Sequence, residues 1–319
     1  MKLDVVVPTY NRSGLLQKTL ASLFQATVPP GLDVSVLVID NNSPDDTAEM
    51  VQRLQAETTL PLRYIPERKQ GLSHARNAGI AASSADLIGF IDDDEEIDAT
   101  WYSVVAREFA DPSVHFIGGP YLPNWVTPVP DWLPPGYHAA IGAIPPKPRS
   151  LFGKSLGANL MGGNAVIRRE VFSTVGTYAP HLGRSSKGLL SEEDAEFYRR
   201  LDGAGMKGIY VPDLLIYHFI APDRLTRTYH RRWVLWRAIS QGLLDRELPE
   251  AVPYFGGVPR YKIGKAIRSL LTMPAHRLQK GGKGQAFADE LASWDLAGFI
   301  YGKHFFKMEE YYSEKKSGT

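Results

Sequence analysis

Short apolar runs alternate with helical patterns along the first third of the chain. After each of the first three runs, apolar residues recur every three or four positions, as on one face of a helix. Strands and helices that alternate in this way predict a parallel sheet with helices on both faces. Polar residues follow three of the four runs, where sheets of this kind bind ligands. The runs are residues 5–7, 34–39, 62–65 and 87–91, and the polar residues are Thr9, Asp40 and Asp92.

The fourth run ends in five consecutive acidic residues, three aspartates followed by two glutamates. Because side chains alternate along an extended backbone, we expect Asp92 and Asp94 to point to one side and Asp93 to the other. Two carboxylates on one side suit Mg²⁺ or Mn²⁺, which takes its remaining ligands from water and phosphate oxygens. The pattern therefore predicts a metal site for a nucleotide ligand. The alternative is a solvated loop that opens the next helix, where negative charge is favoured.

The composition indicates a globular protein and does not point to a particular partner. With 44% hydrophobic and 22% charged residues, the 319-residue chain is typical of a folded globular protein. Its formal net charge of +1 gives no reason to expect nucleic acid as a partner. The absence of cysteine excludes disulfides and thiol chemistry. Because no apolar run approaches the roughly 18–20 residues of a membrane helix, we expect a cytoplasmic protein, at most peripheral on the cytoplasmic membrane face.

The middle of the chain contains a long proline-rich segment at residues 120–149. A loop of this length is usually functional or a linker. As a functional segment, it would be a lid whose aromatic faces hold a sugar ring on the acceptor side. The alternative is an irregular cover that packs its aromatic side chains on the core. The aromatic residues are Tyr121, Trp125, Trp132 and Tyr137.

Three further features concern the ends of predicted elements. Gly162 and Gly163 precede a strand and would let the backbone approach a ligand closely; the alternative is a β-bulge. A strand at residues 214–217 would deliver His218 at its end, after an acidic-headed helix. We also expect Ser13 to cap the first helix.

Beyond Arg224 the pattern is helical and basic, with two more helices predicted at residues 261–271 and 285–312. Helices that mix basic and aromatic residues can lie on anionic membrane surfaces. The alternatives are a helical cap packed on the rest of the chain and a contact between two copies. The residues concerned are Arg231, Arg232, Trp233 and Trp236.

Seven short motifs occur in this order: VVVPTYNR at 5–12, IDNNS at 39–43, GLSHARNAG at 71–79, FIDDD at 90–94, GGN at 162–164, RRE at 168–170 and ED at 193–194. Together they resemble the inverting family 2 glycosyltransferases, which are nucleotide-sugar enzymes of the GT-A fold. The order of the motifs adds specificity that each one lacks alone. The resemblance covers residues 1–220, and the last third of the chain matches only loosely.

The resemblance implies an α/β fold of GT-A type. Its central sheet would be mostly parallel and flanked by helices, with a C-terminal helical extension. We expect the catalytic domain at residues 1–222, with a nucleotide-sugar-binding half at 1–119 and an acceptor half at 120–222. Residues 223–319 would form the helical extension.

The resemblance also implies how the donor is bound. Tyr10 would stack on the nucleobase, and Asp40 and Arg76 would hydrogen-bond its edge. Asp92 would lie beside the ribose and diphosphate. From the residues alone, Asp40 is equally a turn-forming residue, and Arg76 is alternatively a solvated charge or a cation with a buried stem. The other nucleotide-sugar-binding residues would be Pro8, Thr9, Asn11, Arg12, Asp93, Gly163 and Asn164.

The same resemblance implies a metal and a base. Asp94 would ligate Mn²⁺ or Mg²⁺ together with Asp92, and His218 would complete the metal shell. A bound metal neutralises a departing diphosphate. From the residues alone, a structural role for His218 is as well supported.

Asp194 matches the general base of the family, and Glu193 is the second candidate. Such a base takes the proton of the acceptor hydroxyl as the new bond forms. The alternative is a capping box, in which the Asp194 carboxylate accepts a hydrogen bond from the Ser191 N–H. The acceptor itself would meet Trp125, Trp132, Arg232 and Trp233.

We therefore expect a metal-dependent, inverting bacterial enzyme of polysaccharide biosynthesis. It would transfer one hexose or N-acetylhexosamine from a UDP-linked donor to a carbohydrate or lipid-linked acceptor. Processive relatives carry a Gln-x-x-Arg-Trp motif, of which only Arg232-Trp233 is present, with Tyr229 in place of glutamine. The C-terminal helices would contact a membrane surface or a second copy. The alternatives are a sugar-nucleotide pyrophosphorylase and a non-catalytic nucleotide-sugar-binding protein.

Overall fold

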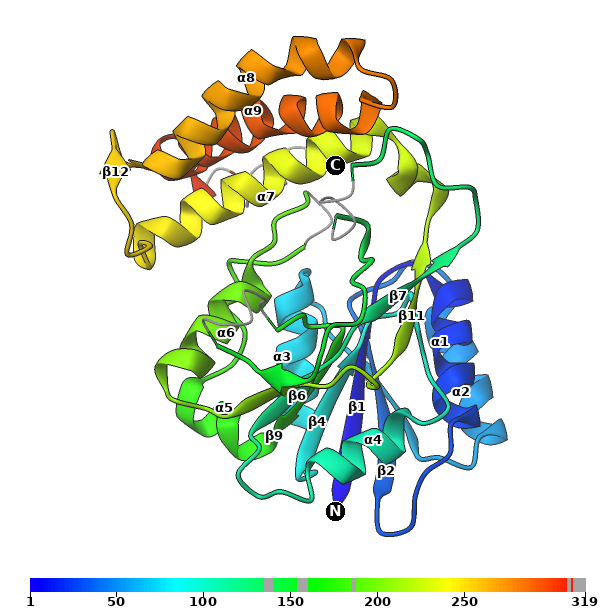
Figure 1. The fold of residues 1–319 in the computed structure, drawn as a ribbon. Coiled ribbons are helices and arrows are strands. Elements are labelled where there is room, and N and C mark those ends of the chain that lie inside the picture. The colour runs from blue at the N-terminus through cyan, green and yellow to red at the C-terminus, as the bar shows by residue number, and fades with distance from the viewer. Residues whose placement is uncertain (135–139, 154–159, 185–187, 309–310, 312–319) are drawn as a thin grey trace, which may run out of the picture. The chain divides into compact units, whose positions relative to one another are not determined.

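The computed structural model describes residues 1–134, 140–153, 160–184, 188–308 and 311. The chain divides into two compact units (Figure 1). The first, here called the α/β unit, comprises Met1–Trp125, Gly142–Ser186 and Glu193–Ile220. The second, here called the helical unit, comprises Val126–Ile141, Lys187–Glu192 and Ala221–Thr319. The functional halves expected within residues 1–222 stay a prediction.

An eight-stranded sheet forms the centre of the α/β unit, in the order β3-β2-β1-β4-β9-β6-β10-β8. The pairs β1–β2, β1–β4, β2–β3 and β6–β10 are parallel. β9 is antiparallel to both β4 and β6, and β8 is antiparallel to β10. The predicted α/β fold with a mostly parallel sheet is confirmed. The strands are β1 (Lys2–Thr9), β2 (Asp33–Asp40), β3 (Leu62–Pro66), β4 (Leu87–Ile91), β6 (Phe116–Gly118), β8 (Ser150–Leu151), β9 (Asn164–Arg168) and β10 (Gly208–Tyr210).

Helices cover both faces of this sheet, because its central strands send apolar side chains alternately into two cores. On β1, Val5 and Val7 pack in the core formed with α1, α2 and α4. Val6 lies in the opposite core, formed with α3, α5 and α6. The helices are α1 (Ser13–Gln25), α2 (Thr47–Glu57), α3 (Leu72–Ala82), α4 (Trp101–Glu108), α5 (Arg169–Val175) and α6 (Glu193–Gly203).

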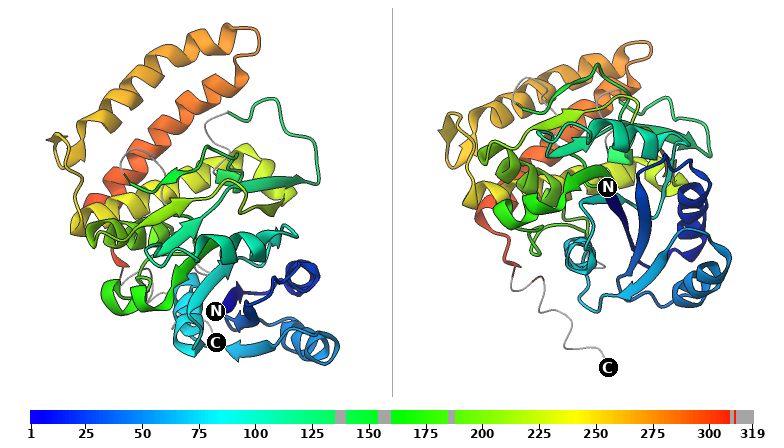
Figure 2. Two further views of the ribbon diagram at one scale, coloured as in Figure 1. Left: turned by 60° about the horizontal axis from the view of Figure 1, so that its bottom comes forward. Right: turned by 90° about the horizontal axis from the view of Figure 1, so that it is seen from below.

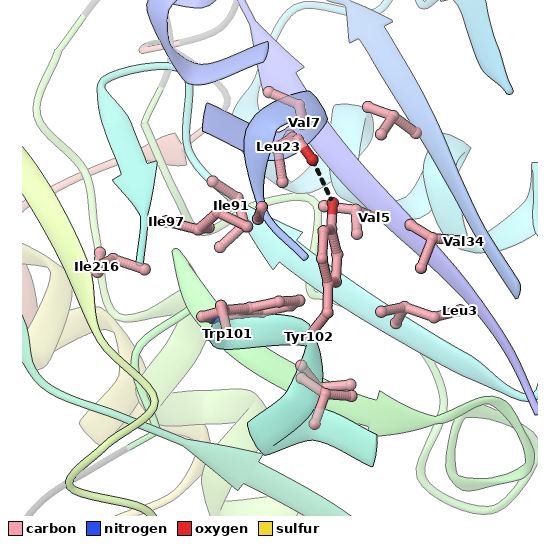
Figure 3. Packing of buried hydrophobic residues seen from close by; sticks show 14 of the residues in the cluster. Leu3, Val5, Val7, Leu23, Val34, Ile91, Ile97, Trp101, Tyr102 and Ile216 are labelled. Atoms are coloured by element: carbon pink, nitrogen blue, oxygen red, sulfur yellow. Dashed lines mark hydrogen bonds between the residues drawn. The ribbon is translucent and has the colours of Figure 1, made fainter. Parts of the chain in front are cut away.

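Two large aromatic residues of α4 anchor the first core (Figure 3). The rings of Trp101 and Tyr102 lie edge to face with centroids 5.5 Å apart. The Tyr102 hydroxyl donates a hydrogen bond to the Leu23 carbonyl at 3.1 Å, and Trp101 Nε1 donates to Asn164 Oδ1 at 3.1 Å. These contacts fix α4 to the end of α1 and to the first residue of β9.

A small second sheet in the order β5-β11-β7 carries His218, one of the predicted metal ligands. Its strands are β5 (Glu95–Ile97), β7 (Tyr121–Trp125) and β11 (Ile216–Ile220). β11 is antiparallel to β5, and this register places His218 opposite Glu95. The expectation that His218 follows a strand is wrong, because the strand starts later than predicted and includes the histidine.

Three long helices dominate the helical unit (Figures 1 and 2): α7 (Arg227–Glu247), α8 (Arg260–Leu278) and α9 (Lys283–His304). α9 packs along α7 and along α8. A short 3₁₀ helix, η2 (Pro222–Leu225), precedes α7, and a hairpin of β12 (Tyr254–Phe255) and β13 (Val258–Pro259) joins α7 to α8. The predicted C-terminal helices are confirmed. No helix in the described ranges is both long and apolar enough to cross a bilayer.

The ends of some elements differ from expectation. Ser13 is the first residue of α1 rather than its cap, and its N–H donates to Asp45 Oδ2 at 3.0 Å. The last helix ends at His304 instead of near residue 312, which lies outside the described residues. Helix ends depend on tertiary contacts that periodicity does not encode.

Replacing Gly79 with alanine is expected to destabilise the α/β unit. A Cβ at this position of α3 would lie 2.4 Å from Val6 Cγ1 on β1. Overpacking of this kind costs about 1–3 kcal/mol of the free energy of unfolding, which urea denaturation followed by circular dichroism measures. Gly14→Ala in α1 is the matched control, because nothing lies within 4 Å of its Cβ. Equal urea midpoints for the two variants would contradict the tight packing of α3 on β1.

Candidate active site

The three aspartates after β4 do not alternate as expected. β4 ends at Ile91, and a turn begins within the acidic run. Asp93 Oδ1 and Asp94 Oδ2 both lie 3.2 Å from Nη1 of Arg12, whereas Asp92 Oδ1 lies 3.2 Å from Nη2 of Arg76. The expectation that Asp92 and Asp94 share one side is therefore wrong, because extended geometry stops at the end of the strand.

Asp94, Glu95 and His218 form a buried group that could hold a metal ion. One ligand atom from each lies within 4.8 Å of the others, and His218 Nε2 is 3.4 Å from Asp94 Oδ1. Asp92, predicted beside Asp94 as a ligand, is not in this group, and Glu95 takes that place. Two hard oxygen donors and an imidazole are a donor set that fits Mn²⁺ and also accommodates Mg²⁺.

Burial makes the negative charge of this group unfavourable without a cation. Burial raises the pKa of Glu95 well above its usual range, and the charges of Asp92 and Asp94 raise it further. Burial, reinforced by the charge of Asp94, raises the pKa of Asp93 to about 7, although Arg12 acts in the opposite direction. A divalent cation would relieve this repulsion, so the donor set fits a metal chemically.

Arg76 of α3 joins the acids after β4 to those at the start of α6. Its Nη1 lies 2.8 Å from Asp194 Oδ1 and 3.3 Å from Glu193 Oε1, and its Nη2 bonds Asp92. The side chain is fully buried against the ring of Tyr178, so the solvated alternative is wrong. One guanidinium thus faces three carboxylates.

These carboxylates carry more negative charge than Arg76 neutralises. Burial, then repulsion by Asp194, raises the pKa of Glu193 to about 7. Burial also raises the pKa of Asp194, against the opposing effects of Arg76 and of the Gly162 N–H. A carboxyl with a raised pKa is a stronger base once it has lost its proton.

The capping-box alternative for Asp194 is wrong. The Ser191 N–H donates to Ser240 Oγ at 3.0 Å, while Asp194 Oδ2 accepts from the Gly162 N–H at 2.9 Å. Asp194 lies in the first turn of α6, but its carboxylate is directed to Arg76 and to the glycine pair.

Gly162 and Gly163 let the backbone run directly against these acids. A Cβ at 162 would lie 2.4 Å from Asp194 Oδ1, and a Cβ at 163 would lie 2.3 Å from Glu95 Oε1. Both glycines precede β9, which starts at Asn164, so they are not a bulge within that strand. They lie against both the base candidate and the metal group.

The predicted donor-binding residues at the end of β1 and just after it differ in burial. Pro8 and Thr9 are buried at the end of β1, where Thr9 Oγ1 donates to Asp93 Oδ2 at 2.8 Å. Tyr10, Asn11 and Arg12 follow and are exposed, and their contact with a nucleotide stays a prediction.

Asp40 is buried and already hydrogen-bonded. It accepts from the Ser43 N–H at 2.9 Å and from the Tyr64 hydroxyl at 2.6 Å, which is the turn-forming arrangement. Asn164 is also committed to the fold: Nδ2 donates to the carbonyls of Pro120 and Leu214, and Oδ1 accepts from Trp101. Contact of either residue with a donor stays a prediction.

The four acceptor candidates are not all in one unit. Trp125 ends β7 in the α/β unit. Trp132 packs edge-on against His230 and Phe287 within the helical unit, as the cover interpretation expects. Trp233 also packs in that unit, Arg232 is exposed, and Tyr137 lies outside the described residues. Their contact with an acceptor stays a prediction.

Residues 4–176 match the sequence model of the family described as glycosyl transferase family 2. This chain belongs to that family. The match covers all of the motif-bearing strands up to β9, so the resemblance drawn from the motifs is confirmed. Family membership leaves the pyrophosphorylase alternative without support.

Named relatives are similar over most of the chain. A glucosyl-dolichyl phosphate glucuronosyltransferase of Haloferax volcanii is 25% identical over 257 residues, covering 79% of this chain and 80% of the relative. The succinoglycan biosynthesis protein ExoM of Rhizobium meliloti is 24% identical, covering 76% of this chain and 73% of that protein.

Solved structures support the fold. A mannosyltransferase of Pyrobaculum calidifontis in complex with GDP-Man and Mn²⁺ has a TM-score of 0.63 at 19% identity, covering 95% of this chain and 88% of that chain. TarS 1-349 of S. aureus in complex with UDP has a TM-score of 0.53 at 15% identity, covering 100% and 93%. The GT-A fold is confirmed.

Glu193→Gln is expected to flatten the pH dependence of stability. The folded-state pKa of about 7 exceeds the unfolded value of 4.5, so the folded chain binds more protons between these values. Stability from this group is therefore present at low pH and is lost as pH rises toward 7. The variant should lose less free energy of unfolding between pH 4.5 and 7.5 than the unsubstituted chain, by on the order of 1 kcal/mol or more.

Urea denaturation at several pH values measures this difference. The control is Glu170→Gln on α5, whose side chain is exposed and should follow the unsubstituted chain. A Glu193→Gln profile parallel to both would show that the folded state leaves the pKa of Glu193 unchanged.

Proposed function

We propose that this chain is a metal-dependent inverting glycosyltransferase that moves one sugar from a nucleotide-diphosphate sugar to a carbohydrate or lipid-linked acceptor. One observation carries the proposal: two buried acidic groups, Asp94–Glu95–His218 and Glu193–Asp194, lie on either side of Asp92 and Arg76. The first has metal-binding chemistry, and the second contains a carboxylate suited to act as a base. Transfer from a diphosphate donor needs both.

Asp94, Glu95 and His218 would hold Mn²⁺ or Mg²⁺. When bound, the ion supplies a Lewis acid that neutralises charge on the diphosphate. Arg12 lies next to this group on an exposed segment and already pairs with Asp94, so it is placed to contact the same phosphates. Tyr10 beside it is exposed, and a nucleobase would stack on its ring.

Asp194 is the better candidate for the base. Its side chain is 20% exposed whereas that of Glu193 is 7% exposed, so an acceptor hydroxyl can reach only the former readily. Arg76 opposes the rise that burial causes in the pKa of Asp194, and the 2.8 Å contact would hold the carboxylate in place. We propose that Glu193 supports Arg76. Asp92 would orient the same guanidinium from the side on which the donor binds.

The names of relatives support the donor and acceptor that we propose. The Haloferax relative is named for a glucosyl-dolichyl phosphate, and ExoM for succinoglycan biosynthesis. We therefore propose a lipid-linked or growing polysaccharide acceptor for this chain. GDP-Man and UDP occur in complexes of similar fold, and a UDP-linked hexose or N-acetylhexosamine donor stays our prediction. A cytoplasmic location, at most peripheral on a membrane, also stays a prediction.

A nucleoside diphosphate with Mn²⁺ is expected to raise the melting temperature of the chain. Glu95→Gln should shrink this rise strongly, because it removes one charged ligand from the metal group, and Asp94→Ala should abolish it. Glu96→Gln is the matched control: Glu96 is the next residue of β5 and is outside the metal group. A thermal-shift series with UDP and GDP, with and without Mn²⁺ or Mg²⁺, measures the effect. Equal shifts in Glu95→Gln and Glu96→Gln would remove Glu95 from the site.

Asp194→Asn is expected to separate binding from transfer. The amide keeps the size of the side chain but takes up a proton far less readily, so turnover should fall by about 10²-fold or more while the metal-dependent thermal shift persists. Sugar transfer or donor hydrolysis, followed by nucleotide release, measures the loss. Unchanged turnover would move the base to Glu193. Metal-dependent binding without transfer by the unsubstituted chain, across a broad acceptor panel, would favour the non-catalytic alternative.

A further inference from the structure

The outer face of α8 carries a row of exposed apolar side chains. Ile267, Leu271 and Leu278 are 55%, 76% and 89% exposed. At 100° per residue they fall within a sector about 40° wide. Ile267 and Leu271 therefore share one face, and Leu278 continues it in the last turn, beyond Pro274. Leu270, also exposed, lies beside this stripe.

The face of α8 that packs on α9 is, by contrast, mostly polar or made of small residues, with Ile263 as an apolar contact. Lys262, Ala266 and Ser269 are buried there, and Lys262 Nζ pairs with Asp295 of α9 at 2.9 Å. A helix of a water-soluble protein normally buries its apolar stripe. The stripe on α8 is turned outward instead, which marks an interaction surface.

The charges around this stripe have one sign. α8 contains no aspartate or glutamate, and the exposed Arg268 and Arg277 lie to either side of the stripe, whereas the exposed Lys265 lies farther round the helix. Within the described ranges, Lys265 and Arg268 belong to no ion pair. The acids of α9 near α8 already have partners: Asp295 pairs with Lys262, Asp289 with His276, and Glu290, which also interacts with Arg277, with Arg231.

We propose that the outer face of α8 binds an anionic lipid surface. Ile267, Leu271 and Leu278 would enter the headgroup region, and the flanking cations would meet lipid phosphates. A second copy of the same face is a poor occupant, because apposing two such faces would bring like charges together. This proposal goes beyond the transfer reaction and does not depend on it.

The location differs from the one that the sequence indicates. Trp233 and Trp236 of α7, the aromatic residues of the basic segment, pack inside the helical unit against other apolar side chains. They are therefore not available as the main membrane-facing group. The sequence of α8 lacks tryptophan, so its surface is found only from the exposure of its leucines and isoleucine.

Vesicle flotation of the full chain, without nucleotide, tests the proposal. We expect binding to mixed phosphatidylcholine–phosphatidylglycerol vesicles, weakened by salt, and little binding to phosphatidylcholine alone. Leu271→Ser/Leu278→Ser and Arg268→Glu/Arg277→Glu should each weaken binding about tenfold or more. All substituted side chains are exposed, and unchanged melting temperatures confirm that the variants fold.

Two matched controls should bind as the unsubstituted chain does. Phe255→Ser removes a 71% exposed apolar side chain from the hairpin, and Arg53→Glu/Arg68→Glu makes the same change of net charge in the α/β unit. Equal loss in the controls, or binding that ignores lipid charge, would overturn the proposal. So would light scattering that shows a dimer lost in Leu271→Ser/Leu278→Ser, which would make this face a contact between copies. Because nucleotide is absent, vesicle binding is independent of the thermal shifts and turnover that test the transferase.

Discussion

The site depends on the ion pairs that the buried guanidinium of Arg76 forms with three carboxylates. The guanidinium joins the acids that follow β4 to the acids that open α6, two segments far apart in the sequence. Leaving these carboxylates unpaired in the protein interior would be strongly unfavourable, since a buried charge without its partner is among the most destabilising features known. Arg76 therefore sets the spacing between the donor side and Asp194, and we regard it as a positioning residue.

Among the described residues, the acids of the site outnumber the cations near them, which are Arg12, Arg76 and Arg184. Arg76 and Arg12 together meet Asp92, Asp93, Asp94, Glu193 and Asp194, and Glu95 lies buried beside them. The excess negative charge explains why the pKa values of several of these carboxyls are raised. The same excess favours cation binding, because positive charge relieves the repulsion between carboxylates that the fold holds close together.

Local patterns predicted the sheet, its helical layers and the C-terminal helices, because apolar spacing along a segment reflects the faces that it buries. They were less able to predict where side chains point once a strand has ended, as at Asp92 and Asp94. Glu95 was missed because its partner, His218, comes from a distant strand. The partners of Arg76 and the packing of Trp132 likewise depend on contacts that neighbouring residues do not reveal.

The pairing of β5 with β11 has a consequence for how such a protein can change. Glu95 and His218 are opposite each other because the strands β5 and β11 pair in this register. The length of the chain between them does not determine this pairing. Loops between Ile97 and Ile216 can therefore be lengthened, shortened or exchanged while Glu95 and His218 remain opposite one another. The pairing of these two strands thus fixes one pair of side chains while the segments around it change in length and sequence.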